Sequence, residues 1–157
     1  MIGDWLERKE VCICAGSGGV GKTTTSAAIA LGMAARGKKV AVLTIDPAKR
    51  LANSLGLPEL GNEERLVKAD VEGELWAMML DPKRTFDEIV EWHAPDERTR
   101  DAILSNRIYQ ELSNAVAGSQ EYMAMEKLHE LHQEGRYDLL VLDTPPTRNA
   151  LDFIDAP

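Results

Sequence analysis

Four short apolar runs divide the chain, and segments of different character separate them. The runs are rich in β-branched and aliphatic side chains, as expected for strands that are buried on both faces of a parallel sheet. We therefore predict strands over Val11–Ala15, Val40–Ile45, Leu75–Leu80 and Leu139–Leu142.

The segments between these runs predict helices and one loop. Residues Thr23–Arg36 are rich in Ala, Leu, Ile and Met and end at Gly37, a favourable residue after a helix C-terminus. A short helix is predicted over Ala48–Leu55, and a polar, acidic loop over Glu59–Glu74. The segment from about residue 82 to 136 has helical periodicity and is too long for a single crossover helix, so it predicts a helical subdomain.

Strands and helices that alternate in this order predict a doubly wound α/β fold with a mainly parallel sheet and a helical insertion. The four predicted strands would leave an uncovered sheet edge, and the chain stops directly after a motif that should begin another helix. We therefore expect residues 1–157 to be the N-terminal part of a larger domain, with the adenine-binding residues beyond the chain end.

Charge and composition narrow the possible partners. The net charge of −8 disfavours a nucleic-acid partner, because phosphate backbones select clustered Lys and Arg. The first ten residues are charged and contain no apolar core of the kind a signal peptide needs, so we expect a cytoplasmic protein. The longest weakly polar run, Ser26–Ala35, is shorter than the roughly 20 residues that span a bilayer, so no transmembrane helix is predicted.

The two cysteines, Cys12 and Cys14, are two residues apart on a predicted strand, which places both side chains on one face. They are poorly placed to pair with each other there. Two thiols could contribute to a site for a soft metal or arsenite, but they do not complete one, and a buried free cysteine behaves as a small hydrophobic residue.

A glycine-rich loop between the first strand and the first helix carries the clearest chemistry. It satisfies the pattern G-x-x-x-x-G-K-[ST] in the context of a P-loop, which predicts a P-loop NTPase that binds ATP and Mg²⁺. Glycines let backbone N–H groups converge on phosphate oxygens, and the following helix adds the positive end of its dipole. We expect Lys22 to contact the β- and γ-phosphates, Thr23 to ligate Mg²⁺ and Thr24 to contact the α-phosphate. The predicted nucleotide-binding residues are Gly16, Ser17, Gly18, Gly19, Val20, Gly21, Lys22, Thr23 and Thr24.

Two aspartates follow predicted strands, at the edge where open α/β sheets bind ligands. Asp143 ends the fourth strand and would anchor Mg²⁺ through its hydration shell, or else cap the next helix. Asp46 precedes Pro47 and would orient the water that attacks the γ-phosphate, or else form an N-cap and N1 pair with that proline.

Three motifs together resemble the ArsA family of anion-transporting ATPases, which includes relatives that target tail-anchored membrane proteins. They are Gly-Gly-Val-Gly-Lys-Thr-Thr at 18–24, Thr-Ile-Asp-Pro-Ala at 44–48 and Asp-Thr-Pro-Pro-Thr at 143–147, in the family's order. Residues 117–123 are also similar to bacterial members. The resemblance spans essentially the whole chain.

The resemblance implies an Mg²⁺-dependent ATPase that couples its nucleotide state to dimer conformation and to a client or anion-transport partner that the sequence does not name. The segment around Asp46 would be switch I and Asp143–Asn149 switch II, with Asp46 as the water-orienting residue. Two subunits, identical or related, would face each other across bound ATP or ADP. Family members are about twice this length, which again favours a truncated chain.

The chain departs from the family pattern at two positions. The family usually has a lysine where this chain has Ser17, and a histidine where it has Lys49. The first departure bears on activation across the dimer, because that lysine reaches the partner's nucleotide. Two alternatives stay open: an ATPase similar to ParA or MinD, and a nucleotide-binding assembly module with little hydrolysis.

Overall fold

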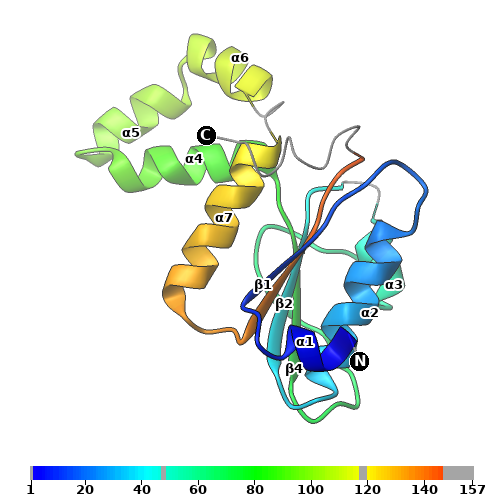
Figure 1. The fold of residues 1–157 in the computed structure, drawn as a ribbon. Helices are drawn as coiled ribbons and strands as arrows, with labels where there is room; N and C mark the ends of the chain where they lie inside the picture. The colour runs from blue at the N-terminus through cyan, green and yellow to red at the C-terminus, as the bar shows by residue number, and fades with distance from the viewer. Residues whose placement is uncertain (1, 47–48, 117–119, 147–157) are drawn as a thin grey trace.

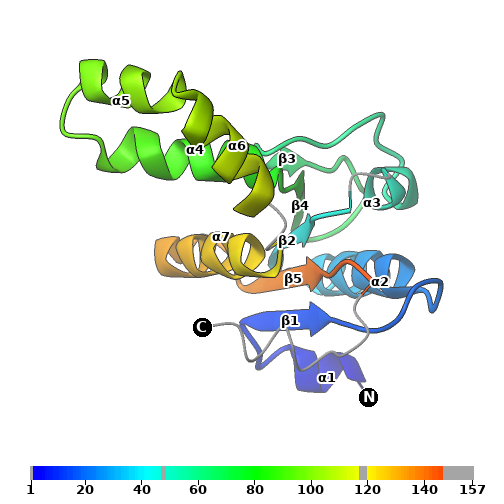
Figure 2. The same cartoon turned by 90° about the horizontal axis from the view of Figure 1, so that it is seen from above.

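The computed structural model describes residues 2–46, 49–116 and 120–146. Its centre is a five-stranded sheet in the order β1-β5-β2-β4-β3, in which the first four are parallel (Figures 1 and 2). This confirms the predicted α/β fold with a mainly parallel sheet. The strands are β1 (Val11–Cys14), β2 (Lys39–Thr44), β3 (Arg65–Leu66), β4 (Glu74–Met79) and β5 (Leu139–Asp143).

The structure adds one strand, β3, to the four that were predicted. This corrects the prediction that residues 59–74 form only a loop and that the sheet has four strands. Strand β3 pairs antiparallel with β4, with Arg65 opposite Ala77 and Leu66 opposite Trp76. Both of its side chains are exposed. A two-residue edge strand without a buried face has no hydrophobic alternation, which is why no pattern indicated it.

One face of the sheet is covered by α2 (Lys22–Ala34), with α3 (Arg50–Ser54) beside it (Figure 2). Ala30, Met33 and Ala34 of α2 are buried in the same cluster as Val40 and Val42. Small residues on α2 let the helix approach the sheet closely. The N-terminus of α2 lies beside the ends of β1 and β5. The loop between β1 and α2 is therefore held by a packed layer.

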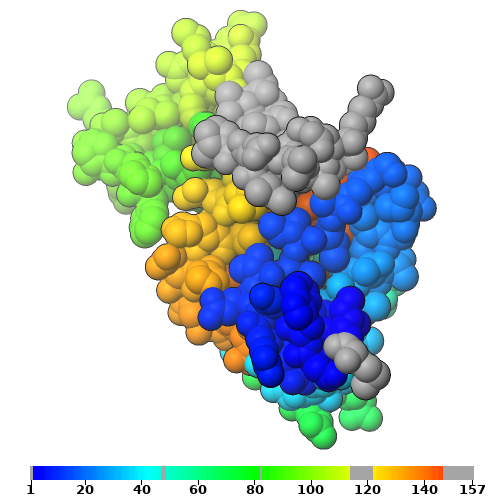
Figure 3. Space-filling view, in the orientation of Figure 1, coloured from blue at the N-terminus to red at the C-terminus, as the bar shows by residue number. Residues whose placement is uncertain are grey.

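An additional helix, α1 (Ile2–Leu6), was not predicted and lies beside β1 (Figure 2). Its residues face the viewer in the lower part of the space-filling view (Figure 3). Arg36, just after α2, contacts Asp4 at 3.1 Å and Glu7 at 2.6 Å. These ion pairs tie the N-terminal segment to the end of α2.

The opposite face is covered by α7 (Gln120–Glu134), whose Met123, Leu128 and Leu131 pack in a cluster with Leu43 and Leu140. The other three helices form a lobe that extends beyond the sheet (Figures 1 and 3). They are α4 (Pro82–His93), α5 (Glu97–Leu104) and α6 (Arg107–Val116). The segment from 82 to 136 thus consists of a sheet-covering helix and a three-helix lobe.

Candidate active site

The loop from β1 to α2 has the backbone of a phosphate-binding loop. Gly16, Gly19 and Gly21 have φ values of 152°, 78° and 90°, which a residue with a Cβ rarely adopts. Gly21 is the N-cap of α2, so the first free N–H groups of the helix follow the loop directly. The predicted placement of the loop between a strand and a helix is confirmed.

Asp143 lies at the end of β5 and is 1% exposed. Its Oδ2 accepts hydrogen bonds from Thr23 Oγ1 at 2.8 Å and from Thr44 Oγ1 at 3.1 Å. Ser26 Oγ lies 3.4 Å from the other carboxylate oxygen. Hydroxyl groups from α2 and β2 therefore surround the carboxylate of Asp143, and hydrogen bonds hold its side chain between these two elements.

Sheet register explains why these residues meet. Asp143 is opposite Cys14 on one side and opposite Thr44 on the other, so the C-terminal ends of β1, β5 and β2 are level. Since α2 starts at this edge, Thr23 in its first turn reaches a carboxylate 120 residues later in the chain. The structure thus brings together the two residues predicted to hold Mg²⁺.

Burial raises the pKa of Asp143 above its ordinary value. The hydroxyls of Thr23 and Thr44 and the charge of Lys22 oppose this rise, because each stabilises the ionised form. A buried carboxylate that is held by hydroxyl groups and faces a lysine is suited to bind a divalent cation beside a phosphate.

Lys22 Nζ donates to the backbone carbonyl of Ser17 at 2.9 Å, across its own loop. Ser17, Gly18, Gly19 and Thr24 are exposed, and Val20 is 62% exposed. The loop is therefore open to solvent on the side where phosphates would enter. None of these side chains is needed to fill the core, which leaves them available for a ligand.

The segment after β5 lies close to the loop between β1 and α2. The hydroxyl of Thr144 donates to the Cys14 carbonyl at 2.9 Å. A Cβ placed on Gly18 would lie 3.7 Å from Pro146. The predicted switch II therefore begins in contact with the loop, while Thr147, Arg148 and Asn149 lie outside the described residues.

Asp46 lies two residues beyond β2, and Arg50 Nη1 contacts its Oδ2 at 2.7 Å. Helix α3 starts at Arg50, and its N-cap is Lys49, with a φ of 55°. The N-cap of α3 is therefore Lys49 and not Asp46, because the helix begins later than predicted. Pro47 and Ala48 lie outside the described residues.

The residues at this edge fit an Mg²⁺ ion. Mg²⁺ takes oxygen ligands, and it commonly uses one or two protein groups together with substrate phosphates and water. Thr23 Oγ1 and the Asp143 carboxylate supply such oxygens within 2.8 Å of each other. Within the described ranges no group of three or more His, Cys, Asp and Glu side chains could hold a metal by itself.

Sequence reasoning missed two residues of this network, Ser26 and Thr44. Ser26 follows Thr23 by three positions and so shares its helix face, while Thr44 precedes Asp46 by two and ends a strand. The sequence shows that Ser26 shares a helix face with Thr23 and that Thr44 ends a strand. Only the strand order shows that both hydroxyls lie beside Asp143.

Cys12 and Cys14 are half-buried on β1 and pack on the α2 side of the core, which confirms that they share a strand face. Both are free thiols. A hydrogen bond from Cys12 lowers the pKa of Cys14 to about 6 against the effect of burial, and the pKa of Cys12 is raised.

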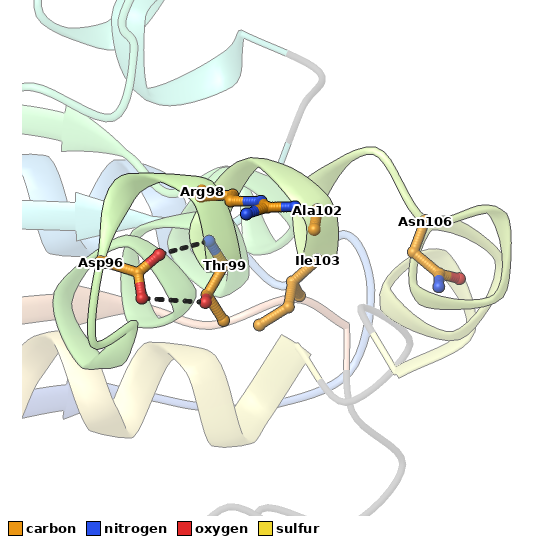
Figure 4. Close-up of a pocket in the computed structure, with 6 residues that line it drawn as sticks. All are labelled: Asp96, Arg98, Thr99, Ala102, Ile103 and Asn106. Carbon is orange, nitrogen blue, oxygen red and sulfur yellow. Dashed lines mark hydrogen bonds between the residues drawn. The ribbon is translucent and has the colours of Figure 1, made fainter.

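A separate hollow of about 560 Å³ lies on α5, far from the loop (Figure 4). One of its polar side chains, Asp96, accepts from the backbone N–H of Thr99 at 2.7 Å and from the Thr99 hydroxyl at 3.2 Å. Both carboxylate oxygens of Asp96 are therefore used in capping α5.

Residues 9–157 match the family model ArsA ATPase, described as anion-transporting ATPase. The chain is 33% identical over 144 residues to ATPase GET3 of Malassezia globosa, which covers 92% of this chain and 41% of that protein. It is 34% identical over 146 residues to ATPase get3 of Aspergillus niger and to ATPase ASNA1 homolog 2 of Paramecium tetraurelia, with 90% of this chain covered and 41% and 42% of theirs.

The chain thus spans about two fifths of the length of these relatives. All three are eukaryotic, so the similarity of residues 117–123 to bacterial members stays a prediction. No helix in the described part of the chain is long and apolar enough to cross a membrane. The family match covers the loop, both aspartates and every strand, and on this basis the chain belongs to the ArsA family of anion-transporting ATPases.

Proposed function

We propose that this protein is a cytoplasmic, Mg²⁺-dependent ATPase that couples its nucleotide state to the conformation of a dimer and to a client not yet identified. The observation that carries the proposal is the hydrogen bond of 2.8 Å between Thr23 and Asp143. It joins the end of the phosphate-binding loop to the strand-end carboxylate and so forms an oxygen-lined corner beside Lys22.

Each part of the loop has a proposed role. The backbone N–H groups of residues 16–21 and the N-terminus of α2 would bind the phosphate oxygens, and Thr24 would contact the α-phosphate. Lys22 would leave the Ser17 carbonyl and neutralise the β- and γ-phosphates. Thr23 and Asp143 would hold Mg²⁺, which supplies positive charge to the phosphate oxygens when bound.

Asp46 is the proposed water-orienting residue. Its carboxylate lies beyond the end of β2, the strand next to β5, and is only partly exposed. Arg50 now contacts it at 2.7 Å, and this ion pair would have to open or turn before the carboxylate could face a water beside the γ-phosphate. Arg50 is 62% exposed, so water can replace its contact with Asp46 when the pair opens.

Ser17 bears on how fast the reaction runs. In the proposed dimer this position faces the partner's nucleotide, and a cation supplied there can raise the rate by roughly 10³–10⁵. A serine hydroxyl carries no charge to stabilise the developing negative oxygens. We therefore expect slow hydrolysis in a homodimer, with a related lysine-bearing subunit, or Lys49, Arg50 or Arg148, as the source of the missing charge.

The second candidate function is a nucleotide-binding assembly module with little hydrolysis, which Ser17 favours. The family match speaks for the ArsA assignment over the ParA and MinD alternative. Nucleotide binding and hydrolysis must be measured separately to distinguish the two remaining functions.

The experiment uses the full-length protein with Lys22→Ala, Asp46→Asn and the control Lys39→Ala. Lys39 is a lysine at the opposite end of β2 that contacts Glu74 at 3.2 Å. Calorimetry should show ATP affinity weakened about 10–150-fold in Lys22→Ala, the equivalent of a lost charge-assisted bond of about 1.5–3 kcal/mol, and unchanged in Lys39→Ala. Asp46→Asn should bind ATP normally but turn it over about 10²–10⁴-fold more slowly.

The outcomes separate the proposals. Equal ATP affinity in Lys22→Ala and wild type would overturn the nucleotide site. Binding without turnover in the wild type, alone and with a co-purifying partner, would establish the assembly module instead. Equal turnover in Asp46→Asn and wild type would remove Asp46 from the mechanism.

A further inference from the structure

Thr44 is the last residue of β2 and is 2% exposed. Its hydroxyl donates to Asp143 Oδ2 at 3.1 Å and accepts the backbone N–H of Asp46 at 3.2 Å. One buried oxygen atom thus contacts both the candidate magnesium anchor and the backbone of the candidate water-orienting residue.

The other two hydroxyls near Asp143 have different connections. Ser26 Oγ is closer to the Lys22 carbonyl, at 2.9 Å, than to Asp143, at 3.4 Å, so its single proton goes to the carbonyl. Thr23 donates at 2.8 Å, but its oxygen is the proposed Mg²⁺ ligand and belongs to α2. Thr44 is therefore the donor that holds the carboxylate from the sheet side.

We propose that the Thr44 hydroxyl is a positioning group that fixes the Asp143 carboxylate for Mg²⁺ and links it to the Asp46 backbone. This inference rests on the proposed Mg²⁺-dependent nucleotide site. The hydroxyl uses its proton for Asp143 and a lone pair for Asp46, and serine has the same two capacities. Valine has the shape of threonine but neither capacity, so Thr44→Val removes the link while it keeps the volume.

The link has a directional consequence. When Asp143 shifts to meet a cation, the Thr44 hydroxyl that donates to it moves as well. This movement changes the distance between the hydroxyl and the Asp46 N–H, and so makes or breaks the hydrogen bond that the N–H donates. The state of the metal site would thereby reach the start of switch I through a single side chain. Loss of the hydroxyl should weaken metal-dependent binding and also slow hydrolysis, without weakening metal-free nucleotide binding.

The test measures binding of a non-hydrolysable ATP analogue to the full-length protein by calorimetry, with Mg²⁺ and with EDTA, in wild type, Thr44→Val and Thr44→Ser. The matched control is Thr85→Val, which removes a hydroxyl that is similarly buried, at 4% exposure, but that donates to the backbone carbonyl of Asp81, the N-cap of α4. Thermal unfolding of each variant shows whether it folds, and Thr44→Ala replaces Thr44→Val if the valine variant does not.

We expect the Mg²⁺ concentration for half-maximal binding to rise about 10–150-fold in Thr44→Val, the effect of one buried hydrogen bond to a charged group. Binding in EDTA should be unchanged, Thr44→Ser should restore the Mg²⁺ response, and Thr85→Val should match wild type. An unchanged Mg²⁺ response in Thr44→Val, or an equal loss in Thr85→Val, would overturn the inference. Failure of the wild type to bind the analogue at all would instead overturn the proposed function.

Discussion

The two ends of the parallel sheet carry different chemistry. At the C-terminal end, Asp143 is buried and collects hydroxyls from distant elements, while the adjacent loop is open to solvent. At the N-terminal end, Asp138 accepts the backbone N–H of Lys39 at 2.7 Å, and Lys39 also pairs with Glu74 at 3.2 Å. Polar groups at the N-terminal end are thus paired with one another close to solvent.

The difference between the two ends of the sheet helps to distinguish a candidate functional site from a structural contact. Exposed ion pairs such as Lys39–Glu74 are screened by water and demand little of the surrounding fold. A buried carboxylate such as Asp143 has a raised pKa, and the hydroxyls of Thr23 and Thr44 and the charge of Lys22 stabilise its ionised form against burial. The end that holds an acidic group in the interior is the end where function is expected.

The first prediction compares two variants, each of which replaces a carboxylate with an amide, at the two ends of β5. Asp143→Asn should reduce Mg²⁺-dependent nucleotide binding and turnover about 10–100-fold, because it removes the negative charge that anchors the hydrated cation. Asp138→Asn keeps an acceptor for the Lys39 N–H and should leave both unchanged. The comparison fails if calorimetry with Mg²⁺ finds the two variants alike.

The second prediction concerns stability at the N-terminal end. A Cβ on Gly73 would lie 2.1 Å from the Lys38 carbonyl oxygen, which is backbone and unable to move aside without distorting β2. Gly73→Ala should therefore lower the free energy of unfolding by about 1–3 kcal/mol, measured by urea unfolding.

Gly61→Ala is the matched control for this change, because a Cβ there meets nothing within 4 Å. The folded Gly73→Ala protein should keep its Mg²⁺-dependent nucleotide affinity, since the affected contact lies at the other end of the sheet. A loss of affinity without loss of stability would contradict the division between the two ends.

The strands and the loop were predictable because their signals are local. Val40–Ile45 is an uninterrupted apolar run, and Gly16 to Thr23 carries a motif with one structural context. Asp143 was identified from its place at a strand end, and the structure brings it to Thr23. Local pattern was therefore sufficient for the four parallel strands and for the two ends of the proposed Mg²⁺ site.

The remaining features depend on contacts between distant segments. Strand β3 forms only because Arg65 and Leu66 meet β4, and the role of Thr44 follows from strand order, which no local pattern encodes. Lys49, with a positive φ, is the N-cap of α3, so the helix starts later than predicted, and Arg50 in its first turn contacts Asp46. Backbone choices of this kind are decided by tertiary packing, so propensity misplaces them.

The smallest effect is expected at Glu64, where a charge is partly buried for structural reasons alone. Arg136 Nη2 lies 2.5 and 2.7 Å from its two oxygens, and the Tyr137 hydroxyl donates at 3.0 Å. Burial raises the pKa of Glu64, but the bonds from Arg136 and Tyr137 outweigh it, and the net pKa is lowered. A lowered folded-state pKa contributes stability above the unfolded pKa, and this contribution is lost as pH falls through the folded-state value.

Glu64→Gln should therefore destabilise the full-length protein at pH 7 by about 0.5–1 kcal/mol, a modest value because Arg136 is largely exposed and solvent screens the pair. The difference from wild type should start to shrink as the pH falls below the ordinary glutamate pKa of about 4.3, and it should disappear only below the lower folded-state pKa, where the folded wild-type carboxylate is also protonated. Glu63→Gln, at an exposed neighbouring position, is the control and should show no pH-dependent difference. Urea unfolding at both pH values decides the case: a Glu64→Gln deficit that persists undiminished in acid would mean that side-chain packing, and not the charge, holds this cluster together.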